Sequence, residues 1–95
     1  MRIKTHPGEI LRTEFLEPLG ISVHALAVAL RVPATRIGEI VNQRRAVSAD
    51  TALRLARYFG TTPQFWINLQ SAFDLSRAEA EGGNAIRDDI KPRAA

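Results

Sequence analysis

The chain has 95 residues, of which 45% are hydrophobic and 24% charged, and it has no cysteine. One small globular domain fits this length and composition. The lack of cysteine excludes disulfides, thiolate metal sites and cysteine nucleophiles. No apolar run approaches the roughly 18 residues that span a bilayer, and Met1 to Lys4 are not followed by the apolar stretch of a signal peptide. We therefore expect a soluble cytoplasmic protein without membrane contact.

The formal net charge is +3, and its distribution along the chain is uneven. Residues 1–60 carry nine Lys or Arg against five Asp or Glu, whereas residues 61–95 carry four against five. A phosphate-binding face needs such a basic surplus, although an ordinary solvated surface produces the same counts.

Five segments have helical periodicity and none has the alternation of a strand, which predicts an all-α fold of about five helices. The first runs from about Pro7 to Glu17, because proline suits a first helical position and Pro18 and Gly20 are expected to end it. The second begins at Ser22, which is a good N-cap.

A third helix is predicted from Pro33 to about Asn42, followed by a basic loop. Ser48 caps a fourth helix and Gly60 ends it. The residues expected to face inward on the second, third and fourth helices are Leu26, Ala27, Leu30, Val32, Ile37, Ile40, Val41, Leu53, Leu55, Ala56 and Phe59.

A fifth helix opens at Thr62–Pro63 and carries Phe65, Trp66, Leu69 and Phe73. Ser76 to Glu79 has the pattern of a capping box that begins a separate short helix. Gly82–Gly83 is expected to break the preceding helix, and the remainder has too few apolar residues to order itself alone.

The second and third helices, over about 22–42, are joined by a turn of about three residues. This spacing is typical of a helix-turn-helix, whose second helix enters the major groove of DNA. Ala27 is the small residue that lets the two helices approach. Over Ile21 to Phe59 the segment resembles the phage-repressor-like (XRE) family.

Two positions depart from that family's pattern. Arg31 stands where the turn usually has glycine, so we expect a left-handed backbone there at a cost of about 1 kcal/mol. Val23 stands where many members carry a polar residue that contacts the DNA backbone, so we expect that contact to be absent or replaced.

The outward face of the third helix carries the expected base contacts. Thr35 offers a hydroxyl and a methyl, and Arg36 has the donors to bind guanine bidentately or a phosphate. Glu39 either accepts from cytosine or pairs with an arginine. The residues predicted to read bases are Ala34, Thr35, Arg36 and Glu39. Those predicted to contact phosphates are Ser22, Asn42, Gln43, Arg44 and Arg45, with a solvated loop as the alternative for the last two.

Segments outside this motif narrow the family. They are HPGEIL (6–11), EFLEPLG (14–20), TPQFWINLQ (62–70) and AFDL (72–75). These segments closely resemble the HigA antitoxins, and together with the helix-turn-helix the resemblance covers about Thr5 to Leu75. It implies a HigA-like domain over residues 1–75 and, over residues 76–95, an extension that is partly disordered or contacts a dimer partner or a toxin.

The resemblance further implies a bacterial repressor that binds a palindrome near its own promoter. It also implies that the protein neutralises a HigB-type toxin, an endoribonuclease that cleaves messenger RNA during translation, and is the labile partner of that toxin. One small basic domain makes few base contacts, so tight operator binding favours a homodimer with half-sites about 34 to 36 Å apart.

We expect the dimer surface on the fifth helix and the residues after it. Its candidate residues are Phe65, Trp66, Leu69, Phe73 and Leu75, with closure of the core as the alternative role for the first three. The first helix and the tail after Gly82 are both candidates for toxin contact.

The sequence contains no recognisable catalytic or metal site, so we expect no enzymatic activity, metal or cofactor. His6 is expected to precede or cap the first helix and His24 to lie at the surface, and neither has a ligand partner at a recognisable spacing. Two alternatives are an XRE-type regulator without a toxin and a toxin-binding module that has lost DNA affinity.

Overall fold

The first helix is continuous from Pro7 to Leu19 but widens in its middle. The computed structural model, which describes residues 2–94, divides it into α1 (Pro7–Ile10), a π-helical segment η1 (Leu11–Leu16) and α2 (Glu17–Leu19). His6 caps its start as predicted, because its Nδ1 accepts a hydrogen bond of 2.9 Å from the N–H of Gly8.

Pro18 lies inside this helix, although the sequence predicted that the helix ends before it. Proline donates no hydrogen bond, and its ring crowds the carbonyl four residues earlier. The wide turn just before it, in which the N–H of Glu17 bonds the carbonyl of Arg12 five residues back, accommodates the proline. The predicted end at Glu17 was therefore wrong, and the helix ends at Gly20 with a left-handed φ of 65°.

Three short helices follow: α3 (Val23–Leu30), α4 (Ala34–Val41) and α5 (Ala49–Phe59). The N-caps predicted for α3 and α5 are confirmed. Ser22 Oγ accepts a hydrogen bond of 3.0 Å from the N–H of Ala25, and Ser48 Oγ accepts one of 3.3 Å from the N–H of Thr51. Each cap satisfies a backbone donor that the first turn leaves free.

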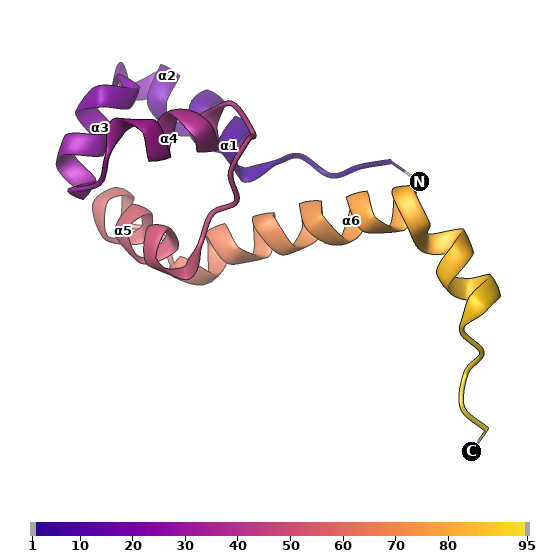
Figure 1. The fold of residues 1–95 in the computed structure, drawn as a ribbon. Coiled ribbons are helices and arrows are strands. Elements are labelled where there is room, and N and C mark those ends of the chain that lie inside the picture. The colour runs from indigo at the N-terminus through magenta and orange to yellow at the C-terminus, as the bar shows by residue number, and fades with distance from the viewer. Residues whose placement is uncertain (1, 95) are drawn as a thin grey trace.

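The last helix, α6 (Pro63–Asp89), is longer than predicted. Ser76 starts no new helix, since its Oγ accepts a hydrogen bond of 2.8 Å from the N–H of Lys4 and donates one of 2.9 Å to the carbonyl of Phe73. The predicted break at Gly82–Gly83 was also wrong. Figure 1 shows that α6 instead changes direction in its last third, as glycines inside a helix permit.

The shape of the molecule follows from α6. Helices α1 to α5 gather around its first turns, while the rest of α6 projects away from them and the extended N-terminal segment runs beside it (Figure 1). The extents are therefore unequal, at 52 × 23 × 21 Å.

The core lies among the first helix, α3, α4, α5 and the start of α6. Its fully or almost fully buried apolar residues are Leu11, Leu16, Leu26, Ala27, Leu30, Ile37, Ile40, Val47, Ala52, Leu55, Ala56 and Trp66. Leu53 was expected inside but is 60% exposed. On α5 the buried stripe passes through Ala52, Leu55 and Ala56, and Leu53 lies about 100° around the helix from Ala52.

The part of the chain that the structure describes contains no strand, which confirms the predicted all-α class. Across residues 2–94 no single helix has the length and apolar composition of a membrane span. The pair Pro7–Leu19 and Val23–Leu30 reaches that threshold only together, with a bend of 99° between them.

Gly8 is the point where the first helix touches the end of α4. A Cβ atom at this position would overlap the carbonyl oxygen and carbon of Ile40, which are backbone atoms that cannot turn aside. Only glycine therefore permits this approach. The close contact gives a physical reason for the glycine in the segment HPGEIL.

We predict that Gly8→Ala lowers the free energy of unfolding by about 1–3 kcal/mol, because α1 and α4 must separate to admit the methyl group. Gly82→Ala is the matched control, since a Cβ there meets nothing within 4 Å and alanine favours the helix by about 1 kcal/mol. Urea denaturation followed by circular dichroism measures both. Equal stability of the two variants would contradict the contact at Ile40.

Candidate nucleic-acid interface

Helix α4 presents one face to the core and the other to solvent. Ile37 and Ile40 are 0% exposed, whereas Ala34 and Thr35 at its start are exposed and Arg36 is partly so. Spacing apolar residues three apart on a short helix produces this two-sided arrangement. The burial fixes the rotation of the helix, so the residues predicted to read bases lie on the outward side.

Helix α3 packs closely on α4 through small residues. Ala27 is buried, as predicted for a small residue between the two helices. Gly38 is a second small residue, which the sequence analysis missed, and a Cβ there would meet Val23 Cγ1 at 4.0 Å. Val23 therefore packs against α4.

Two non-glycine residues among those described have a left-handed backbone, and they flank α4. Arg31 has φ 61°, as predicted, and Gln43 has φ 62°. After Gln43 the chain reverses through a bond of 2.8 Å from the N–H of Arg44 to the carbonyl of Glu39. A left-handed backbone costs a non-glycine residue about 1 kcal/mol or more, so the surrounding packing must offset this strain before and after α4.

Ion pairs surround the exposed face of α4. Glu39 Oε1 lies 2.9 Å from Arg45 Nη2, so the carboxylate pairs with an arginine, which was one of its two expected roles. Arg36 Nη1 lies 3.2 Å from Asp50 Oδ2 on α5. Arg54 Nε contacts the same oxygen at 2.9 Å. The hydrogen bond from Arg54, with the positive charges of Arg54 and Arg36, lowers the pKa of Asp50.

The loop after α4 is fastened to α6 by Gln70. This buried amide accepts a hydrogen bond of 2.8 Å from the N–H of Val47 and donates one of 2.9 Å to Asp74 Oδ1. A buried amide with both partners satisfied is rigid. Gln70 thus fixes the loop that carries Arg44 and Arg45, although both arginines are exposed.

The remaining predicted phosphate contacts lie at two helix ends. Asn42 and Gln43 are exposed at the C-terminal end of α4, next to the two loop arginines. Ser22 is exposed at the N-terminal end of α3, where its hydroxyl is already the cap acceptor. Between α4 and α5 is a hollow of about 330 Å³ lined by Arg36, Arg45, Ala46, Ser48, Asp50 and Thr51.

No site role was predicted for Asp50, Arg54 or Gln70. Asp50 and Arg54 are four residues apart on a predicted helix, a spacing that favours an ion pair, and this signal was available. The contacts of Gln70 with the loop and of Asp50 with Arg36 join separate elements, so local spacing does not reveal them.

Aromatic residues of α6 close the core. Trp66 is 0% exposed, and its Nε1–H donates a hydrogen bond of 2.8 Å to Thr61 Oγ1. Its ring centroid lies 5.2 Å from that of Phe15 on the first helix. The core role, which was the alternative to a dimer contact, therefore applies to Trp66 within the chain.

His6 lies beside the loop that carries Arg44 and Arg45. Its ring and that of Phe73 form a T-shaped pair with centroids 4.8 Å apart, and Arg77 stacks on Phe73 at 5.2 Å. Burial lowers the pKa of His6, the charge of Asp74 opposes this shift and that of Arg77 adds to it. The neutral imidazole fits this site because Nδ1 accepts the bond from Gly8. The other histidine, His24, is exposed as predicted.

Two short helices packed at a tight turn, the second with a polar outward face beside arginines, define a helix-turn-helix DNA-binding protein. A family model described as Helix-turn-helix matches residues 13–66. Virulence-associated protein I of Dichelobacter nodosus is 59% identical over 76 residues, covering 80% of this chain and 70% of that protein.

Two solved structures are similar over almost the whole chain. Pseudomonas aeruginosa antitoxin HigA with the higBA promoter has 51% identity and a TM-score of 0.92, covering 95% of this chain and 98% of the other. An addiction module antidote protein of a HigA family from Coxiella burnetii has 43% identity and a TM-score of 0.91, covering 97% and 100%. The chain belongs to the HigA family.

We predict that folding stability depends on pH through His6. Because its folded pKa lies below the ordinary value of about 6.5, the unfolded chain binds a proton that the folded chain excludes. Stability is then full above about pH 6.5 and decreases as the pH falls from there toward the folded pKa.

Denaturant titrations between pH 5 and 8 measure this dependence. His6→Gln should flatten the profile below about pH 6.5, because it removes the group whose pKa burial lowers. An unchanged profile in His6→Gln would exclude His6 as its source.

Proposed function

We propose that the chain is a sequence-specific DNA-binding antitoxin that represses its own toxin–antitoxin operon and neutralises a HigB-type toxin. The observation that carries this proposal is the fixed, outward face of α4 with Thr35 and Arg36 at its start. Its support is the likeness to an antitoxin HigA solved with the higBA promoter. The protein acts in the bacterial cytoplasm without catalysis or a cofactor.

We assign base readout to the exposed side of α4. Thr35 has a hydroxyl for a base edge and a methyl for thymine, while Ala34 offers only a methyl contact. Arg36 has the donors for guanine O6 and N7. Glu39 pairs with Arg45 in the free protein. When Arg45 leaves it to bind a phosphate, the Glu39 carboxylate is free to accept a hydrogen bond from a cytosine amino group.

Contacts to the DNA backbone come from the flanks of this helix. Arg44 and Arg45 hold phosphates from a loop that Gln70 keeps in place. Asn42 and Gln43 add neutral donors at the end of α4, and Ser22 has a hydroxyl proton to donate at the start of α3. These contacts set the register of the protein on DNA.

A titration of purified protein tests this assignment. The probes are a duplex from upstream of the chain's own gene and a scrambled duplex of equal composition, each at several salt concentrations. We expect the specific complex to be at least about 10³ tighter, with a salt dependence that reports several phosphate contacts. Equally weak binding of both duplexes would refute the repressor assignment.

Two kinds of variant separate the proposed roles in the same assay. Thr35→Ala and Arg36→Ala should each reduce discrimination between the duplexes by about 1–3 kcal/mol. Arg44→Ala should weaken both complexes alike and reduce the salt slope by about one. A change in discrimination caused only by Arg44→Ala would reverse these roles.

We further propose that the protein is a homodimer joined along α6. Trp66 and Leu69 serve the core, and the partly buried Phe73 packs against His6, so the exposed residues of α6 are the better candidates. Leu75, before the change of direction in α6, is 71% exposed, and Ile86, after it, is 54% exposed. Phe65 is 38% exposed near the start of α6. It contacts the second protomer only if the dimer surface reaches that end of the helix.

Sedimentation of charge variants tests the dimer surface. Leu75→Glu should shift the protein toward a monomer, because it places a charge in an apolar contact. Leu53→Glu is the control, since Leu53 is an exposed leucine on α5 and should leave the dimer intact. A monomer produced by Leu53→Glu alone would move the dimer surface to α5.

Toxin neutralisation rests on family membership, and the gene neighbourhood tests it. We expect an adjacent short reading frame of about 90 to 110 residues with a basic product, a size within the usual range of one domain. Co-expression of the two chains should give a stable complex that survives purification. If no such frame adjoins the gene, the chain is a helix-turn-helix regulator without a toxin.

A further inference from the structure

Arg36 is held before any DNA is bound. Its Nη1 lies 3.2 Å from Asp50 Oδ2, and its side chain is 31% exposed. A free arginine side chain loses considerable rotamer freedom when it binds a base edge. A group that restrains the guanidinium in advance reduces this loss and narrows the set of bases that it reaches.

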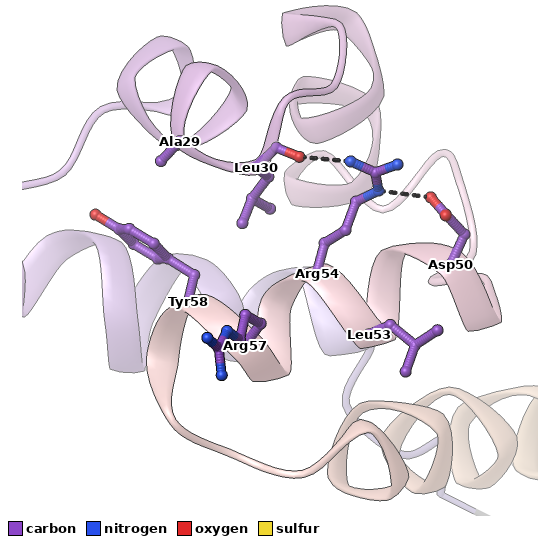
Figure 2. Close-up of a pocket in the computed structure, with 7 residues that line it drawn as sticks. All are labelled: Ala29, Leu30, Asp50, Leu53, Arg54, Arg57 and Tyr58. Carbon is purple, nitrogen blue, oxygen red and sulfur yellow. Dashed lines mark hydrogen bonds and ion pairs between the residues drawn. The ribbon is translucent and has the colours of Figure 1, made fainter.

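Asp50 is itself held by a second arginine. Arg54 Nε contacts Asp50 Oδ2 at 2.9 Å, and Arg54 Nη1 donates a hydrogen bond of 2.8 Å to the carbonyl of Leu30. Figure 2 shows Arg54 lying between this carbonyl and the carboxylate. Leu30 is the last residue of α3, just before the turn. A chain of contacts therefore runs from the end of α3, through α5, to the outward side of α4.

We propose that Asp50 is a positioning residue for operator recognition, which Arg54 anchors to the carbonyl of Leu30 and which orients the Arg36 guanidinium for base readout. This inference rests on the proposed function. It assigns a role in DNA specificity to two residues outside the helix-turn-helix itself.

A purely structural role for the ion pair would instead appear as a loss of folding stability when Asp50 is replaced. Exposed ion pairs contribute little to folding, and Asp50 is 58% exposed, so its loss should scarcely change stability. A carboxylate near DNA also repels phosphates, so its removal should strengthen specific and nonspecific binding alike and leave their ratio unchanged. Loss of positioning weakens specific binding alone, so it lowers the ratio of specific to nonspecific affinity.

The test uses the full chain with the operator-region and scrambled duplexes, at one fixed salt concentration. We expect Asp50→Asn to lower the ratio of specific to scrambled affinity about tenfold in the wild-type background and to leave it unchanged in Arg36→Ala. Asp50→Glu, which keeps the charge, should restore part of the ratio. Glu17→Gln is the matched control, since Glu17 is 60% exposed, pairs with Arg12 at 2.8 Å and lies outside α3 to α5.

The outcomes are distinguishable. If the wild type discriminates but Asp50→Asn keeps the ratio, or lowers it equally in Arg36→Ala, the positioning role is wrong and the proposed function stands. If the wild type does not discriminate, both are wrong. Thermal unfolding of each variant excludes misfolding as the cause, and a large loss of stability in Asp50→Asn would favour the purely structural role.

Discussion

The burial of Ile37 and Ile40 determines how this protein presents its proposed DNA-binding surface. Helix α4 has eight residues, which is too short to be stable in water without tertiary contacts. Each buried isoleucine contributes on the order of 1.5–3 kcal/mol, and the pair fixes both the existence and the rotation of the helix. Thr35 and Arg36 face outward because the two isoleucines face inward.

Polar contacts from α5 and α6 add precision to that arrangement. Gln70 on α6 holds the loop after α4, and Arg54 on α5 holds the end of α3, just before α4 begins. One contact is buried and the other is partly exposed, so they respond differently to solvent and salt. The proposed DNA-binding surface is in this way braced on both sides by α5 and α6.

Local signals in the sequence were sufficient for most helix starts, since a cap such as His6, Ser22 or Ser48 acts within three residues. They failed where neighbouring structure overrides propensity. A widened turn accommodates Pro18 inside a helix, and α6 continues through Gly82–Gly83. The outward residues of α4 were placed correctly from periodicity. Their ion-pair partners were not, because Asp50 reaches Arg36 across fourteen residues of chain.

The last turns of α6 stand apart from the packed helices. Residues 84–90 are all exposed, and Arg87 holds this end through its own helix, by contacts with Glu79 and with Asn84 at 2.7 Å. Such a segment opens locally at a free energy well below that of global unfolding. When opening is fast, a protease cuts at a rate set by this local equilibrium. The lifetime of the chain in a cell is therefore adjustable by substitutions in these turns, without altering the helices that carry Thr35 and Arg36.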